Sequence, residues 1–188
     1  MKKQLDIFFT ALMFYTRIPC PKNITHDPTY LNKATRYFPL IGWIVGGIGA
    51  LVFAISYKAF SLELAILFSL LANILTTGAF HEDGFADVCD GFGGGWTKEK
   101  ILIIMKDSAI GAYGAIGLIL LFAIKFFALK MLLNEFINHP YIQDDIVFVT
   151  FVYTIGIIDN EIIIDNEIII DNEIIIDNES IKLAKNIL

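Results

Sequence analysis

The segment HEDGFADVCDG, residues 81–91, concentrates acidic side chains directly after a stretch that carries no charge. Asp83, Asp87 and Asp90 follow one another at intervals of four and three residues. In an α-helix these positions lie at about 0°, 40° and −20° around the axis, because each residue turns the helix by about 100°. A helix over 82–90 would therefore carry the three carboxylates as one stripe on a single face.

Aligned carboxylates repel one another unless a cation lies among them, and hard oxygen ligands suit Mg²⁺, Mn²⁺ or Ca²⁺ better than zinc. Mg²⁺ commonly takes one or two protein carboxylates and completes its shell with water and phosphate oxygens. The stripe therefore predicts a divalent-metal site of a kind that suits phosphoryl transfer. The alternative is a solvated acidic loop that only marks a membrane boundary.

Three neighbours of the stripe have predictions of their own. His81 lies off the acidic face and has three interpretations: a general base, a phosphate contact or a residue at a helix end. Glu82 is also off this face and is expected to point to solvent. Gly91 is expected to end the helix.

The next segment, FGGGWTKEKILIIMKDSAIGAYGAIG (92–117), supplies further polar candidates. Its three consecutive glycines predict a mobile loop whose amides could approach a phosphate, although such loops are common. Thr97 is typical of the start of a short helix. Lys106 is placed to neutralise phosphate and Asp107 to add a metal ligand, with Ser108 beside them. The alternative is a snorkelling lysine next to an ordinary interfacial aspartate.

Long apolar runs predict the helices that position these residues. The chain of 188 residues is 56% hydrophobic, and its mean hydropathy is +0.64. Crossing a bilayer takes about 20 mostly apolar residues, and about 17 still suffice. The expected fold is an all-α, polytopic helical integral membrane protein, with a membrane-embedded domain over 1–158. Its expected spans, of which the last is short by itself, are 37–57, 62–80, 108–133 and 146–158.

The distribution of basic residues predicts the orientation. Lys and Arg gather before the first span and again in 81–107, whereas 134–145 contains neither. Because Lys and Arg favour the cytoplasmic side of short loops, the N-terminus and the acidic segment are expected in the cytoplasm. Residues 4–16 are expected to form a helix that lies against the membrane or dips into it.

Small residues are assigned to packing. The glycines of the spans are expected to let helices approach closely; they are Gly42, Gly46, Gly47, Gly49, Gly111, Gly114 and Gly117. Cys20 and Cys89 have neither metal-site nor redox spacing and are also expected to pack.

The tail over 159–188 repeats DNE at a six-residue period. This period distributes charge evenly around a helix, and two acids in each repeat cannot cross a bilayer. The tail is therefore expected to lie outside the fold. It also supplies much of the net charge of −6, so that charge indicates no partner.

Four motifs occur together in this chain: TRIPCP (16–21), RYFPLIGWIVGG (36–47), TTGAFHEDGFADVCDGFGG (76–94) and IMKDSAIGAYG (104–114). In this order they resemble the cobalamin synthase family, the adenosylcobinamide-GDP ribazoletransferases. The resemblance covers roughly residues 5–133.

The resemblance implies a polytopic enzyme of the cell inner membrane that acts on small molecules and no nucleic acid. Such enzymes transfer the adenosylcobinamide-phosphoryl group from adenosylcobinamide-GDP to α-ribazole or its 5′-phosphate, release GMP and need Mg²⁺. The matching positions make Asp83, Asp87 and Asp90 the implied metal ligands and, with His81 beside them, the implied catalytic group. The implied contacts to the substrate diphosphate are Arg17, Lys106, Asp107 and Ser108.

Two other functions fit less well. A membrane CDP-alcohol phosphotransferase would need an arginine where Asp87 stands, and a divalent-cation carrier would need acidic groups near the middle of a span. Family members also continue with further membrane helices where this chain has its repeat. The repeat therefore predicts a truncated and inactive enzyme.

Overall fold

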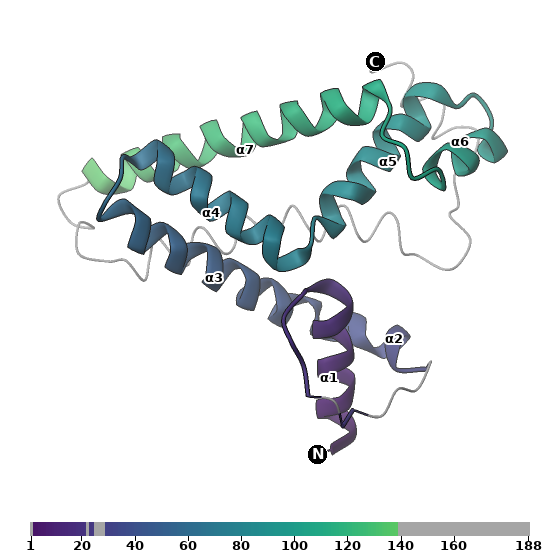
Figure 1. Cartoon of the computed structure of the whole chain (residues 1–188), viewed down its shortest axis with the longest axis horizontal. Coiled ribbons are helices and arrows are strands. Elements are labelled where there is room, and N and C mark those ends of the chain that lie inside the picture. The colour runs from purple at the N-terminus through teal and green to yellow at the C-terminus, as the bar shows by residue number, and fades with distance from the viewer. Residues whose placement is uncertain (1, 22, 25–28, 139–188) are drawn as a thin grey trace. The chain divides into compact units, whose positions relative to one another are not determined.

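The computed structural model describes residues 2–21, 23–24 and 29–138. Within this part of the chain every regular element is a helix, so the all-α prediction is confirmed (Figure 1). The elements are α1 (Lys2–Tyr15), α2 (Thr29–Ala34), the short 3₁₀ helix η1 (Thr35–Tyr37), α3 (Phe38–Tyr57), α4 (Leu62–Thr77), α5 (Phe80–Gly94), α6 (Lys98–Met105) and α7 (Ala112–Asn138). The predicted segment 146–158 and the repeat over 159–188 lie outside the described residues.

Among the described residues, two stretches are long and apolar enough to cross a membrane by themselves. They are Thr29–Tyr57, which ends with α3, and Ala112–Glu135 in α7; an 18-residue window within each has a mean hydropathy of 2.2 and 2.3, respectively. The first and third predicted spans thus correspond to helices that could cross a membrane by length and composition, although α7 begins at residue 112 and not at 108. α4 has 16 residues and passes the same test only when it is taken together with α5. Because α5 carries four acidic residues, we do not count it as a membrane-crossing segment.

The second span was predicted to run to residue 80, and this boundary was wrong. α4 ends at Thr77 because Gly78 adopts a left-handed conformation with φ of 72°. Ala79 follows with φ of 61°, which is uncommon for a residue with a side chain. Two consecutive left-handed residues cannot continue a right-handed helix, so α5 starts as a separate helix.

Residues 2–80 and 126–138 belong to one compact unit. Its first core joins α1 to α2 and α3, and its buried members are Ile7, Ala11, Leu12, Tyr15, Tyr30, Ala34, Ile41 and Val45. Its second core joins α3 and α4 to the end of α7, and its buried members are Phe53, Ala65, Ile66, Leu70 and Leu133. The helix expected over 4–16 is confirmed as α1, which carries four of the first core's residues.

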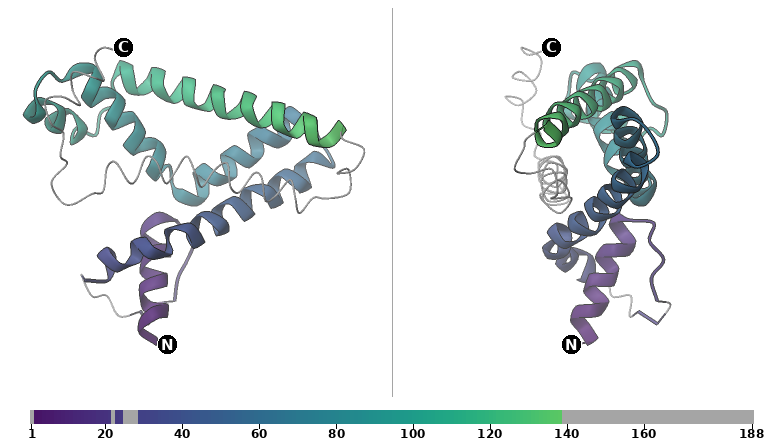
Figure 2. Two further views of the ribbon diagram at one scale, coloured as in Figure 1. Left: turned by 180° about the vertical axis from the view of Figure 1, so that it is seen from behind. Right: turned by 90° about the vertical axis from the view of Figure 1, so that its left-hand side faces the viewer.

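α3 and α4 lie side by side along their lengths, as all views show (Figures 1 and 2). A Cβ at Gly49 would collide with the side-chain amide of Asn73. The buried Ser69 hydroxyl donates to the Gly49 carbonyl oxygen at 2.7 Å. The prediction that glycines permit close helix contact is therefore confirmed at Gly49, whereas a Cβ at Gly47 would meet nothing within 4 Å.

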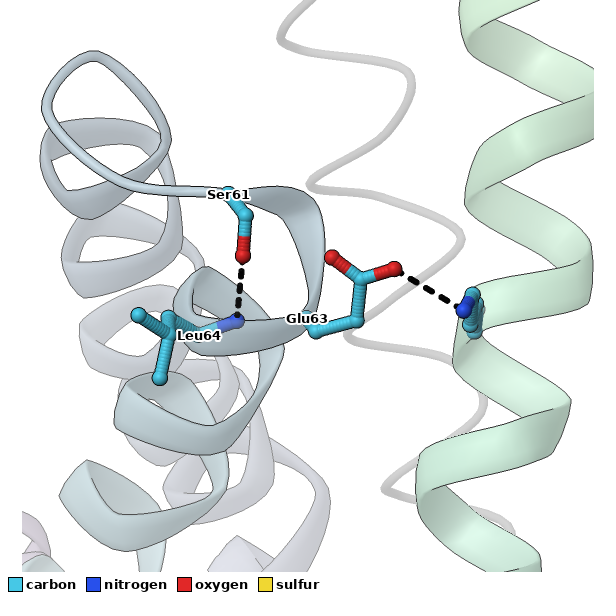
Figure 3. Close-up of polar contacts among 4 residues, drawn as sticks. Ser61, Glu63 and Leu64 are labelled. Carbon is cyan, nitrogen blue, oxygen red and sulfur yellow. Dashed lines mark hydrogen bonds and ion pairs between the residues drawn. The ribbon is translucent and has the colours of Figure 1, made fainter.

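Two polar contacts mark the beginning of α4 (Figure 3). The Ser61 hydroxyl accepts the Leu64 N–H at 3.5 Å, as a helix cap does. Glu63 forms an ion pair with Lys130 of α7, with a distance of 2.8 Å between Oε1 and Nζ. The ion pair therefore joins the beginning of α4 to α7 within the same unit.

Candidate active site

Residues 81–125 form a second compact unit, and α5 supplies its acidic residues. All three aspartates of the stripe lie within this single helix, as the sequence predicted. The helix does not end at Gly91, however, but continues to Gly94. Gly91 instead serves packing within the helix, because a Cβ there would come within 2.7 Å of the Met105 side chain of α6.

The predicted mobile loop over the three glycines was also wrong. Gly93 and Gly94 are helical, and the Gly95 N–H donates to the Gly91 carbonyl oxygen at 2.8 Å. A Cβ at Gly93 would collide with the ring of Tyr113, and one at Gly95 with Ile101. These glycines therefore allow close packing against α6 and α7 and do not form a loop around a phosphate.

α5 packs against the first turns of α7 along a line of three glycines (Figure 1). A Cβ at Gly111 would meet the Asp90 carboxylate, and one at Gly114 would meet the same carboxylate and, at 2.9 Å, the Ala86 carbonyl oxygen. A Cβ at Gly117 would come within 2.7 Å of Sγ of Cys89. The expected packing role of these glycines and of Cys89 is confirmed.

Asp90 closes the N-terminus of α7. Its Oδ2 accepts the Gly111 N–H at 2.7 Å and its Oδ1 accepts the Gly114 N–H at 2.8 Å. The side chain is buried, with 9% of the residue exposed. Both oxygens of this carboxylate are thus engaged by backbone amides of a different helix.

Asp83 and Asp87 remain on the acidic face of α5. Asp83 is exposed and Asp87 is half-buried. Burial raises the pKa of the Asp87 carboxyl above its ordinary value, and the negative charges of Asp83 and Asp90 raise it further. A cation at this position would relieve that repulsion.

The fit of these residues to Mg²⁺ follows from this arrangement. In the part of the chain that the structure describes, no three His, Cys, Asp or Glu side chains come close enough together to hold a metal ion. The predicted convergence of three carboxylates is therefore not seen. Asp83 and Asp87 lie one turn apart on one helix, and two carboxylates agree with the number that Mg²⁺ commonly takes from a protein.

His81 and Glu82 lie at the start of α5. His81 is buried, with 7% of the residue exposed. Glu82 was expected to face solvent, but it is half-buried and its Oε2 is buried without a hydrogen-bond partner. The first turn of α5 is therefore less exposed than was predicted from the position of Glu82 off the acidic face.

Lys106, Asp107 and Ser108 occupy an exposed connection between α6 and α7. The Thr97 side chain accepts the Lys100 N–H at 3.3 Å, which confirms the predicted start of α6. Lys106 follows the last residue of that helix, and the Asp107 side chain accepts the Ala109 N–H at 3.1 Å. All three candidates lie before α7, which begins at Ala112, whereas the predicted third span began at Ser108.

Arg17 belongs to the first unit and lies over the left-handed turn after α4. Its backbone N–H donates to the Thr76 carbonyl oxygen at 2.7 Å, and its guanidinium donates to the Gly78 carbonyl oxygen at 3.5 Å. A Cβ at Gly78 would collide with the Arg17 side chain. Arg17 also lines an open cavity of about 470 Å³ formed by residues 13 and 16–21. Burial raises the pKa of the Cys20 thiol in this wall.

Sequence patterns had not identified the amides of Gly111 and Gly114 as partners of Asp90. Gly111 directly precedes α7 and has no side chain to accept the first amides of that helix, but the predicted span began at residue 108 and so hid this signal.

Comparison with known proteins identifies the family. The cobalamin-5-phosphate synthase family matches residues 7–156. A relative from Shewanella halifaxensis is 52% identical over 124 residues, which are 66% of this chain and 48% of the relative. One from Shewanella frigidimarina is 52% identical over 123 residues, 65% of this chain and 47% of the relative. One from Shewanella woodyi is 48% identical over 132 residues, 70% of this chain and 51% of the relative.

All three relatives carry the name adenosylcobinamide-GDP ribazoletransferase. The chain spans about half the length of the curated relatives it matches. No solved structure matches it. Because the family match extends over most of the described residues and includes α5 and its acidic stripe, the chain belongs to the cobalamin-5-phosphate synthase family.

Proposed function

We propose that this chain corresponds to the part of an adenosylcobinamide-GDP ribazoletransferase that contains the acidic residues of the active site. The observation that carries the proposal is the family match over residues 7–156, which includes the helix with Asp83 and Asp87 on one face. The reaction transfers the adenosylcobinamide-phosphoryl group to α-ribazole or its 5′-phosphate. The products are adenosylcobalamin or its phosphate, and GMP.

In this reaction an oxygen of the ribazole forms a bond to the phosphorus that carries cobinamide. The bond between that phosphorus and the oxygen bridging to GMP breaks, and GMP leaves with the electron pair. The attacking hydroxyl loses a proton to a base. Proteins assist such transfers mainly by positioning the groups and by stabilising charge.

Within this chemistry Asp83 and Asp87 would hold Mg²⁺. The bound ion would neutralise negative charge on the diphosphate. The exposure of Asp83 supports this assignment, as does the pKa of Asp87, which burial and then the negative charges of Asp83 and Asp90 raise.

The remaining candidates are residues that could contact the substrate diphosphate and a residue that could accept the proton of the attacking hydroxyl. Lys106 is an exposed cation, and we assign it to the diphosphate together with Asp107 and Ser108; for Arg17 the same assignment is a proposal from the family resemblance alone. His81 is the imidazole on α5, and we assign it the role of the base that accepts the proton of the attacking hydroxyl.

The site would face the cytoplasm at the inner membrane. Support comes from the basic residues that precede α3 and those in 81–107, since Lys and Arg favour the cytoplasmic side. The apolar stretches Thr29–Tyr57 and Ala112–Glu135 provide the membrane anchoring.

A chimera tests this function. This chain's segment replaces the matching segment of the Shewanella halifaxensis relative, and membranes receive adenosylcobinamide-GDP, α-ribazole and Mg²⁺. We expect GMP and cobalamin in equal amounts, a loss with chelator, and at least a hundredfold loss in Asp87→Asn. A chimera that is inserted into the membrane but forms no GMP would contradict the proposal. The same assay on the chain alone tests the expected inactivity, and divalent-cation flux without GMP release would indicate a carrier.

A further inference from the structure

The three aspartates of α5 have different surroundings. Asp83 is exposed, Asp87 is half-buried, and Asp90 is buried with its two oxygens bonded to the amides of Gly111, which precedes α7, and of Gly114 within α7. We propose that Asp90 is a positioning residue that caps α7 and so holds α5 in place, and that Asp83 and Asp87 alone supply carboxylates to the metal. The metal part of this statement rests on the proposed function, whereas the capping part does not.

The geometry is that of a helix cap supplied from another part of the chain. A capping side chain normally belongs to the residue just before the helix and accepts the N–H of the second or third helical residue. That preceding residue here is Gly111, which has no side chain, and the third helical residue is Gly114. Asp90, 21 and 24 positions away in sequence, accepts both amides.

The charge of Asp90 suits this position. The N-terminus of a helix carries a partial positive charge, so a carboxylate is stabilised there. Hydrogen bonds from amides to a carboxylate are also stronger than those between neutral groups. Asp90 therefore has its charge compensated by α7 without a metal ion.

The glycines of α7 make this contact specific. A side chain at Gly111 or Gly114 would occupy the space of the Asp90 carboxylate. Gly117 continues the same contact against Cys89 and Phe85, one turn further along α7. The cap and the glycine line together fix the rotation and the axial position of α5, and hence the direction of the face that carries Asp83 and Asp87.

The test separates capping from metal binding in the full chain, purified in detergent. Mn²⁺ is the probe, and its dissociation constant is measured by electron paramagnetic resonance. Hydrogen exchange of the Gly111 and Gly114 amides is measured by nuclear magnetic resonance on glycine-labelled protein. The variants are Asp90→Asn and the matched Asp87→Asn, which remove one charge each from the same helix.

We expect Asp90→Asn to accelerate exchange of both amides at least tenfold, because its side-chain NH₂ would face one of the two N–H donors. Its Mn²⁺ dissociation constant should change less than about threefold. Asp87→Asn should weaken Mn²⁺ binding at least tenfold and leave the exchange of both amides unchanged.

Three results would overturn the inference: a tenfold loss of Mn²⁺ binding in Asp90→Asn, unchanged amide exchange in that variant, or faster exchange in Asp87→Asn. If Asp90→Asn does not fold, Gly111→Ala serves, since it retains the carboxylate and obstructs the cap. It should accelerate exchange of the Gly114 amide without loss of Mn²⁺ binding. If neither Asp83→Asn nor Asp87→Asn weakens Mn²⁺ binding, the metal part of the proposed function fails. The capping role of Asp90 is still tested by hydrogen exchange of the Gly111 and Gly114 amides.

Discussion

The contact between α5 and α7 can be tested by adding a single methyl group. Gly114→Ala places a Cβ against the Asp90 carboxylate and 2.9 Å from the Ala86 carbonyl oxygen. Ala86 lies in the middle of α5, so its backbone cannot move without the whole helix. The variant must therefore separate α5 from α7 or rotate one of them.

The magnitude follows from three terms. Overpacking a close contact costs about 1–3 kcal/mol, and weakening a hydrogen bond to a charged group costs about 1.5–3 kcal/mol. The higher helix propensity of alanine returns about 1 kcal/mol. A net loss of about 2 kcal/mol or more is expected, which lowers the Tm of a chain of this size by about 4–8 °C.

The assay is thermal unfolding in detergent, followed by circular dichroism. Gly84→Ala is the matched control, because Gly84 is helical in the same unit and a Cβ there would meet nothing within 4 Å. This control should keep the Tm of the unmodified chain, or its free energy of unfolding should rise by up to about 1 kcal/mol because alanine has the higher helix propensity. A Gly114→Ala variant as stable as Gly84→Ala would refute the close contact.

Four further results are expected. Ser69→Ala removes the buried hydroxyl that donates to Gly49 and should cost about 0.6–1.7 kcal/mol, measured by unfolding in increasing dodecyl sulfate; no change would show that the bond does not join α3 to α4. Glu63→Gln breaks an ion pair whose side chains are 45% and 36% exposed, so we expect only a small loss of stability that disappears at high salt in the same assay. Thr97→Ala removes the cap of α6 and should cost about 0.5–2 kcal/mol, seen as faster amide exchange over Lys98–Met105, with Thr97→Ser as the control that retains exchange protection. The metal-free protein should become more stable as the pH falls through the raised pKa of Asp87, because an acid whose pKa is raised in the folded state favours folding when it is protonated. Asp87→Asn should therefore stabilise the metal-free protein at pH 7. The same variant should also make its stability depend less on pH in this range.

Features that depend on local sequence were predicted well. The apolar runs ending at Tyr57 and starting near Ala112 gave the positions of α3 and α7, because length and hydropathy alone decide whether a helix can cross a bilayer. The spacing of Asp83 and Asp87 correctly placed both on one helix, since helical periodicity is a local property.

Features that depend on tertiary contacts were not predicted. The left-handed conformation of Ala79 has no local signal, because alanine rarely adopts a positive φ. The glycines after Gly91 resembled a loop, yet they serve to bring Ile101 and Tyr113 close to α5. The partners of Asp90 lie in a different helix, and no periodicity along α5 can reveal them.

Metal binding by Asp83 and Asp87 and capping by Asp90 can be tested most directly with Mn²⁺ as an anomalous scatterer in crystals of this chain. We predict one peak at about 2.1 Å from carboxylate oxygens of Asp83 and Asp87, with Asp90 still bonded to the amides of Gly111 and Gly114. A peak coordinated by Asp90, or the absence of any peak along α5 at saturating Mn²⁺, would contradict the account.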